Sequence, residues 1–264
     1  MPSFVVVGAS RGLGYAWLEL LSKDPENIVI GTARNPESTI ERVKKDGLER
    51  VTILQADLSD ITSLKRSVSE VSQLTGGSLD YLIVNGAYLS SVALNRFLDD
   101  FESEPELLQR DLDSYWTTNV VGVINAINAF LPLLRKGTFK KVVAISTGMA
   151  DPDLITEYDL WESAPYSITK AAMNVAIAKY AARYGKSDGI LFLALSPGVV
   201  ETQASSATVD SDLPAKFVRY APHFTGPMTP SESVEAQWAV IQSKSVENGD
   251  GGKFLSHLGN KQWL

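Results

Sequence analysis

The chain has 264 residues, of which 44% are hydrophobic, and a formal net charge of −7. This hydrophobic content suffices for one large core. Because no Pro/Gly/Ser-rich linker or repeat divides the chain, we expect a single domain over residues 1–264. The acidic balance argues against nucleic acid as a partner, since proteins that neutralise phosphate backbones are normally basic. The absence of cysteine excludes disulfides, thiolate metal sites and a cysteine nucleophile, and His223 and His257 lack the spacing of a zinc site, so no metal is expected.

The N-terminal segment and the longest apolar stretch bear on where the protein resides. The segment MPSFVVVGAS has no basic n-region, and its apolar run is too short for a signal peptide. The stretch VVGVINAINAFLPLL carries two Asn and a Pro, which favours a buried helix over a membrane span. We therefore expect a soluble, cytoplasmic protein that does not bind membranes.

Short apolar runs alternate with longer amphipathic stretches along the chain. Nearly continuous apolar runs are typical of strands covered on both faces, and they predict strands at 4–9, 28–33, 51–56, 81–86, 141–146 and 190–195, with a short last strand in GKFLS. Amphipathic stretches predict helices at 13–23, 61–74, 114–135, 167–185 and 231–243. The repeated β-α-β units imply an α/β fold of the doubly wound, Rossmann type, a parallel sheet with helices on both faces. Ligands of such sheets bind beyond the carboxyl ends of the strands.

The first predicted strand leads into the glycine-rich segment GASRGLG. Glycines between a strand and a helix allow a tight turn, a close approach of the backbone to phosphate, and a helix N-terminus directed at the anion. The spacing is G-x3-G-x-G, and in this setting it favours dinucleotide binding. The predicted contacts are Gly8, Ser10, Arg11, Gly12, Leu13 and Gly14.

The residue about twenty positions beyond these glycines distinguishes the two nicotinamide cofactors. NAD enzymes commonly place an acid there to bind the ribose 2′-hydroxyl, whereas this chain has Arg34. A guanidinium can bind a 2′-phosphate bidentately, and Arg11 adds a second cation nearby. The two arginines favour NADP(H) over NAD(H), the alternative being that both are solvated surface residues.

Tyr166 precedes Lys170 by four residues in the segment PYSITKAAMN. With nine Tyr and 14 Lys in the chain, chance gives about half of one such pair, and the sequence contains this one. The spacing places both side chains on one face of a helix, so a lysine resting on an aromatic ring is the plain alternative to half of an active site.

Taken in order, the motifs resemble the short-chain dehydrogenase/reductase family over nearly the whole chain. The matching positions are the glycine turn, Asp57-Leu58, Asn85, Asn119, Ser146, Tyr166-x3-Lys170, Pro197-Gly198 and Thr202. The resemblance implies an NADPH-dependent carbonyl reductase that reduces a ketone to a secondary alcohol.

The resemblance implies a chemical role for each catalytic residue. Tyr166 donates a proton to the carbonyl oxygen, and the Lys170 ammonium is expected to lower the pKa of that tyrosine and to hold the nicotinamide ribose. Ser146 is expected to orient the substrate oxygen through a hydrogen bond. Asn119 is expected to anchor a water that relays protons to Lys170, the alternative being a helix amide bonded to the backbone.

The remaining cofactor contacts also come from the resemblance. Asp57 and Leu58 are expected to hold the adenine, and Pro197, Gly198 and Val199 to lie along the nicotinamide with Thr202 near its amide or phosphate. The turn after the fourth strand contributes Asn85, Gly86 and Ala87.

The sequence departs from the family pattern at several places. Val7 stands where a threonine is usual, and the Asn-Asn-Ala-Gly turn reads Asn85-Gly86-Ala87-Tyr88, so we expect altered packing of these loops without loss of binding. Residues 88–112 and 147–165 are longer than usual. We expect them either to shape the substrate mouth or to serve as subunit contacts or solvated loops. Residues 203–230 are predicted to form a lid over the substrate, with Phe217, Tyr220, His223 and Phe224 able to line an aromatic pocket.

Alternatives to ketone reduction remain open at this stage. The same residues could serve an enzyme that reduces an imine or enone or isomerises its substrate. The alternative that is not an enzyme is a catalytically silent NADP(H)-binding scaffold or sensor. The resemblance also implies a homodimer or homotetramer, with the 114–135 and 167–185 helices supplying small residues for packing between subunits.

Overall fold

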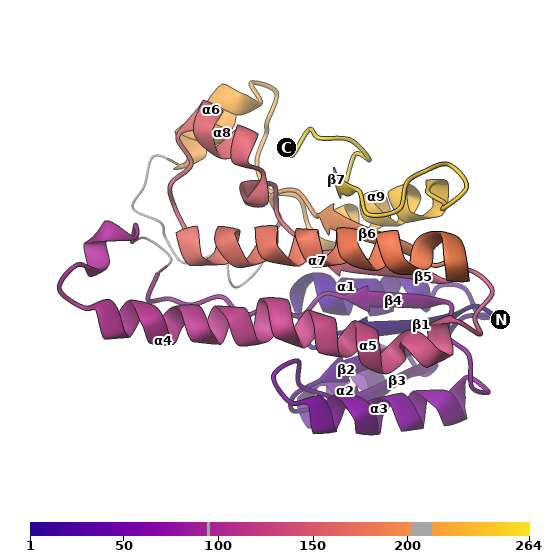
Figure 1. The fold of residues 1–264 in the computed structure, drawn as a ribbon. Helices are drawn as coiled ribbons and strands as arrows, with labels where there is room; N and C mark the ends of the chain where they lie inside the picture. The colour runs from indigo at the N-terminus through magenta and orange to yellow at the C-terminus, as the bar shows by residue number, and fades with distance from the viewer. Residues whose placement is uncertain (94–95, 202–212) are drawn as a thin grey trace.

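The computed structural model describes residues 1–93, 96–201 and 213–264. Its strands form one parallel sheet in the order β3-β2-β1-β4-β5-β6-β7 (Figure 1). The strands are β1 (Ser3–Val7), β2 (Ile28–Ala33), β3 (Val51–Gln55), β4 (Tyr81–Val84), β5 (Lys141–Ile145), β6 (Leu191–Ser196) and β7 (Phe254–Ser256). Every predicted strand is present, which confirms the doubly wound α/β fold. The strand order reverses between β1 and β4, and such a reversal is where parallel sheets of this type bind ligands.

Helices cover both faces of the sheet. The principal helices are α1 (Gly12–Leu21), α2 (Glu37–Lys45), α3 (Ile61–Leu74), α4 (Pro105–Trp116), α5 (Val123–Leu134), α7 (Ala164–Asp188) and α9 (Pro230–Ser243). The π-helix η2 (Thr117–Gly122) joins α4 to α5, so that residues 105–134 form one continuous helical segment. Two short helices, α6 (Pro152–Tyr158) and α8 (Leu213–Tyr220), lie together beyond the carboxyl edge of the sheet (Figure 1).

The core divides into two layers because alternate residues of a strand point to opposite faces. Val5 and Val7 pack in the layer that contains the buried side chains of α3, α5 and α7. Phe4 and Val6 pack in the layer formed with α1, α2 and α9. Burial on both faces explains why the strands read as continuous apolar runs in the sequence.

The segment Pro105–Leu134 is long and apolar enough to cross a membrane by length and composition, since an 18-residue window within it has a mean hydropathy of 1.4. Most apolar residues of its α5 part nevertheless belong to the protein core, since Val123, Ile127 and Phe130 are buried against β4, β5 and neighbouring helices. This is the packing predicted for a buried helix.

Candidate active site

The glycine turn connects β1 to α1 and depends on all three of its glycines. Gly8 and Gly12 have positive φ angles of 84° and 54°, which favour glycine. A Cβ atom added to Gly14 would lie 2.1 Å from the carbonyl oxygen of Gly8. Ser10 and Arg11 are exposed at the N-terminus of α1, and the first turn of that helix carries no acidic residue. The turn therefore lets the main chain approach a phosphate group closely and directs the N-terminus of a helix at it.

The turn after β4 fixes the glycine turn in place. The main-chain oxygen of Val7 accepts hydrogen bonds from the amides of Asn85 (3.0 Å) and Gly86 (2.8 Å). The Asn85 side chain donates to the oxygen of Gly8 over 2.9 Å. These bonds join the two loops without the hydroxyl that Val7 lacks.

Gly86, which replaces the second asparagine of the family pattern, permits close contact between the two turns. A Cβ atom added to Gly8 would lie 2.5 Å from the Cα atom of Gly86, and one added to Gly86 would lie 2.9 Å from Leu58 Cδ1. The altered packing expected at this turn is thus a direct backbone contact. Leu58 is buried in the core behind it, while Ala87 is exposed.

The two arginines expected at the ribose phosphate lie at the carboxyl ends of neighbouring strands. Val7 of β1 pairs with Thr32 of β2, so Arg11 follows one strand end and Arg34 the next. Both residues are exposed, and neither forms an ion pair with another described residue. Asp57, after β3, holds its own turn by accepting bonds from the amide and hydroxyl of Ser59 at 2.9 and 2.8 Å.

Tyr166 and Lys170 occupy the first turns of α7 on one face, as predicted. Lys170 Nζ lies 5.7 Å from the centre of the Tyr166 ring and donates a hydrogen bond of 2.6 Å to the oxygen of Ile145 at the end of β5. Ser146 follows Ile145, and its hydroxyl donates to the side-chain oxygen of Asn174 over 2.8 Å. Asn174 is four residues after Lys170, so one stripe of α7 holds the tyrosine, the lysine and the contact to Ser146.

The ionisation of this pair differs from the sequence expectation. Burial, with a smaller contribution from the neighbouring Tyr115, raises the pKa of the Tyr166 hydroxyl, whereas a lowered pKa was expected. Burial also lowers the pKa of the Lys170 ammonium to about 8. The physical reason is that desolvation disfavours the charged form of each group, and the ammonium is directed at the carbonyl oxygen of Ile145. The tyrosine therefore keeps its proton at neutral pH, the form that a proton donor requires.

Asn119 lies in the π-helix η2 and is fully buried. Its amide oxygen accepts a bond of 2.7 Å from the Tyr88 amide, and its nitrogen donates to the oxygen of Tyr88 (3.1 Å) and the hydroxyl of Thr169 (3.3 Å). The side chain thus joins the turn after β4 to the helix that carries Tyr166. This bonding to the backbone is the alternative that the sequence left open.

The loop after β6 closes the other side of the site. Gly198 has a φ of 79°, and a Cβ atom there would lie 2.5 Å from Met228 Cε. The amide of Met228 donates to the oxygen of Val199 over 2.9 Å, and Pro197 accepts a bond of 2.7 Å from the hydroxyl of Ser233. The predicted contact Thr202 lies outside the described residues. Met228, to which the sequence assigned no role, supports this loop from the segment before α9.

The 147–165 insertion contains α6 and packs against the described part of the predicted lid. Leu154, Leu160 and Trp263 of the C-terminal tail form a cluster with Phe217 and Tyr220 of α8. Phe217 and Tyr220, which the sequence suggested could line a substrate pocket, join the described part of the lid to the insertion. Residues 203–212 of the predicted lid lie outside the described residues.

A buried ion pair also links the lid to the insertion. Lys216 Nζ lies 3.0 Å from Glu162 Oε1, with both side chains more than nine-tenths buried, and it also donates to the oxygen of Asp159 over 2.6 Å. Phe97 from the 88–112 insertion meets Trp161 edge to face, with ring centres 6.3 Å apart. The two insertions therefore meet at the carboxyl edge of the sheet.

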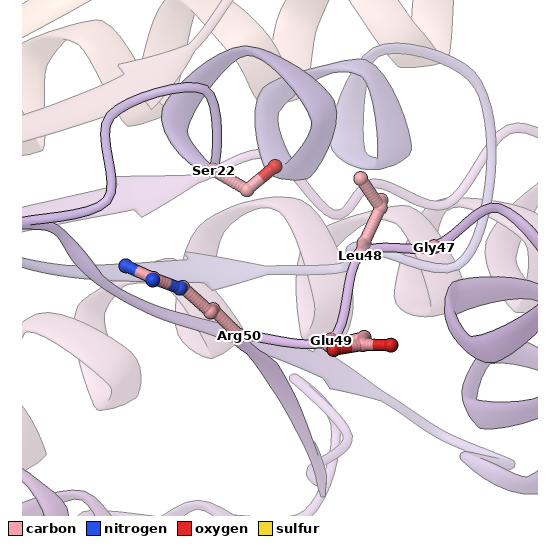
Figure 2. Close-up of a pocket in the computed structure, with 5 residues that line it drawn as sticks. All are labelled: Ser22, Gly47, Leu48, Glu49 and Arg50. Atoms are coloured by element: carbon pink, nitrogen blue, oxygen red, sulfur yellow. The ribbon is translucent and has the colours of Figure 1, made fainter.

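A surface pocket at the opposite edge carries no candidate chemistry. It has a volume of about 200 Å³ and is lined by Ser22, at the end of α1, and residues 47–50, just before β3 (Figure 2). Both segments lead into the amino ends of strands, away from Tyr166. No group of three or more metal-ligating side chains lies among the residues that the structure describes.

Comparison with known proteins agrees with this arrangement. A family model described as short chain dehydrogenase matches residues 3–212. The chain is 46% identical over 269 residues to the short-chain dehydrogenase/reductase AacuF of Aspergillus aculeatus. It is 42% identical over 272 residues to the short chain dehydrogenase virK of Hypocrea virens, and both alignments cover 100% of each chain.

Two solved structures share the fold. One is the NADPH-bound carbonyl reductase from chicken fatty liver, with a TM-score of 0.76, 23% identity and 98% of each chain covered. The other is a short chain dehydrogenase from Burkholderia cenocepacia in complex with NADP, also with a TM-score of 0.76 and 23% identity, covering 98% of this chain and 97% of that one. On the match to the family model and the identity with its relatives, the chain belongs to the short-chain dehydrogenase/reductase family of oxidoreductases.

Proposed function

We propose that this oxidoreductase uses NADPH to reduce a ketone to a secondary alcohol. The observation that carries the proposal is the convergence of Tyr166, Lys170 and Ser146 at the carboxyl end of β5, on the same edge of the sheet as the glycine turn. Reduction of a ketone requires a hydride on its carbon and a proton on its oxygen. These three side chains are suited to delivering the proton.

The residues present fit a nicotinamide dinucleotide. The glycine turn leaves no room for a Cβ atom at Gly8 or Gly14. The N-terminus of α1 has no competing acid, as a pyrophosphate site requires. Arg11 and Arg34 supply positive charge where a carboxylate would repel a 2′-phosphate, which supports NADPH. The solved structures with the same fold include proteins described as bound to NADPH and to NADP.

The protein's own side chains would then move and hold the proton. Bound NADPH supplies the hydride. Tyr166, protonated at neutral pH, donates its proton to the carbonyl oxygen as negative charge develops there. The Ser146 hydroxyl can rotate from Asn174 to the same oxygen and stabilise that charge. Lys170, when protonated, places positive charge beside the phenolate that is left, and Asn174 positions Ser146.

Initial rates of NADPH oxidation with aliphatic, aromatic and polycyclic ketones test this proposal. We expect turnover of at least one class, with the corresponding secondary alcohol as product by mass spectrometry. Absence of an alcohol product from every class, in the presence of tight NADPH binding, would contradict it.

Arg34 is expected to confer the preference for NADPH over NADH. Hydrogen bonds to charged groups are worth roughly 1.5–3 kcal/mol, so Arg34→Leu should weaken NADPH binding by about 10-fold or more. NADH lacks the 2′-phosphate, and its affinity should change by less than about two-fold. Calorimetric titration of both cofactors measures the two effects. Arg50→Leu, an exposed arginine at the opposite edge of the sheet, is the control and should change neither affinity.

We also propose that the protein is a homodimer, formed through the outer faces of the α4–η2–α5 segment and α7. Large apolar side chains are exposed there, including Trp116, Val121, Ile168 and Val175, the last with 60% of its surface exposed. Ile168 and Val175 are seven residues apart and share one face of α7. An apolar surface of this kind is typical of a partner contact.

The dimer is expected to dissociate when a charge is placed on that surface. Light scattering after size exclusion should give twice the chain mass of 28.7 kDa for the wild type and the monomer mass for Val175→Glu. Leu74→Glu, which charges an exposed leucine at the end of α3, is the control and should stay dimeric. A monomeric wild type would refute the proposal, and a tetramer would show that a second surface also associates.

A further inference from the structure

Asp111 of α4 is a buried carboxylate with one oxygen unpaired. The residue is only 5% exposed. Its Oδ1 atom accepts a long hydrogen bond of 3.4 Å from the Tyr88 hydroxyl, while Oδ2 has no hydrogen-bond partner among the described residues. Buried carboxylate oxygens are normally hydrogen-bonded, because desolvating one without compensation is costly. The unpaired oxygen therefore indicates that a further donor belongs here.

The position of Asp111 follows from its register on the helix. Asp111, Tyr115 and Asn119 are each four residues apart and all buried, so they form one stripe that faces the interior. Asn119 donates to Thr169 of α7, and the Tyr115 ring lies 6.4 Å from the Tyr166 ring. Asp111 comes one turn earlier in the helix, about 6 Å beyond Tyr115 and away from the sheet. The segment bearing Asp111 projects past the carboxyl edge of the sheet beside α7 (Figure 1).

Tyr88 connects this carboxylate to the catalytic residues. Its main chain is held on both sides by Asn119, and its ring meets the Tyr115 ring edge to face at 5.0 Å. Tyr115 is itself fixed, since its hydroxyl accepts a bond of 2.9 Å from the Ser90 amide. The rings of Tyr88, Tyr115 and Tyr166 thus lie in a row between Asp111 and the proposed proton donor. Tyr88 and Tyr166 are partly exposed, and the fully buried Tyr115 lies between them.

We propose that Asp111, supported by Tyr88, forms a polar subsite that accepts a hydrogen bond from a hydroxyl group of the substrate. The inference rests on the proposed function and narrows it: the preferred substrate is an aromatic ketone with a hydroxyl group remote from the carbonyl. A hydroxyl suits the subsite better than an ammonium group. One unpaired oxygen matches its single proton, whereas an ammonium group would bury two further donors.

A purely structural role for Asp111 makes a different prediction. If the carboxylate served only to hold Tyr88, Asp111→Asn would keep an amide oxygen for the Tyr88 hydroxyl and would affect all substrates alike. If Oδ2 accepts a substrate hydroxyl, the same change replaces that acceptor by a donor and selectively affects hydroxylated substrates.

The test compares 1-tetralone, its ring-hydroxylated derivatives and their methyl ethers. For the best hydroxylated derivative we expect wild-type kcat/KM to exceed that of 1-tetralone by about 10-fold, the effect of one hydrogen bond to a charged group. The methyl ether, which cannot donate, should lose this advantage. In Asp111→Asn the ratio of hydroxylated to parent ketone should fall to about one. In Asp113→Asn, an exposed acid on the same helix, it should be unchanged. Because the ratio is measured within one preparation, partial unfolding of a variant does not distort it.

A binding measurement separates this inference from the proposed function. Dissociation constants of the same compounds are measured by tryptophan fluorescence in Tyr166→Phe loaded with NADPH, with and without Asp111→Asn. Selective binding that depends on Asp111, without turnover by the wild type, would support the subsite and overturn the reductase. Turnover with no preference for any hydroxylated derivative, or an equal loss for all compounds in Asp111→Asn, would overturn the subsite and leave the reductase standing.

Discussion

Replacing Tyr166 by phenylalanine is expected to lower kcat for ketone reduction by about 10²–10⁴-fold, the usual contribution of a general acid. The change removes one hydroxyl and keeps the ring that packs near Tyr115. NADPH affinity should stay within about two-fold, since the loss concerns a proton delivered as charge develops on the substrate. Initial rates and a fluorescence titration of NADPH measure the two quantities on the same preparation.

Tyr180→Phe is the matched control for this substitution. Tyr180 lies on the same helix, and its hydroxyl bonds to Asn128 and Ile124 away from the site. Its removal should leave kcat within about two-fold, with at most the modest loss of stability of a neutral hydrogen bond. Full activity of Tyr166→Phe would show that another group delivers the proton, and the assignment of Tyr166 would be wrong.

Replacing Gly14 by alanine is expected to weaken NADPH binding by about 100-fold or more and to destabilise the fold by about 1–3 kcal/mol. The new methyl group would lie 2.1 Å from the oxygen of Gly8 and 2.7 Å from the Asn85 side-chain nitrogen. Both neighbours belong to the bond that joins the glycine turn to the turn after β4. The backbone must therefore move where it is expected to meet the pyrophosphate. Calorimetric titration with NADPH and thermal unfolding measure the two effects.

Gly185→Ala is the control for the effect of a methyl group on a helical glycine. Gly185 lies within α7, and an added Cβ atom would lie 3.8 Å from the main-chain oxygen of Ile190, an ordinary van der Waals distance. This substitution should leave NADPH binding unchanged and stabilise the protein by about 0.5–1 kcal/mol, as in other helix interiors. Equal NADPH affinity in Gly14→Ala and Gly185→Ala would contradict the role assigned to the glycine turn.

The sheet could be predicted from the sequence because each strand is buried on both faces. Runs such as Val5–Val7 and Val142–Ile145 leave little alternative to a central parallel strand, and the alternating helices set the topology. Helix α2 was not predicted, since most of its nine residues are polar and only Thr39 and Val43 are buried. Helices α6 and α8 were not predicted either, because their apolar residues pack on each other and on Trp263.

The site was predictable in its residue types and less so in its contacts. The Tyr166–Lys170 spacing and the three glycines act through local geometry, which the sequence carries directly. Asn174 was missed, although its position four residues after Lys170 could have indicated it. The pKa of Tyr166 depends on burial by distant segments, and the closing contact of Met228 with Gly198 joins residues thirty positions apart. Such effects arise from tertiary packing and have no local signature.

The most direct test of the account is transfer of deuterium from NADPH labelled at the reactive position of its nicotinamide. If the protein is an NADPH-dependent ketone reductase, the wild type converts a ketone of the panel into an alcohol with one deuterium on the former carbonyl carbon, detected by mass spectrometry. The same reaction with Tyr166→Phe yields that product at least about 100-fold more slowly. Tight NADPH binding with no labelled alcohol from any ketone would contradict the central claim and favour a protein that binds the nucleotide without reducing ketones.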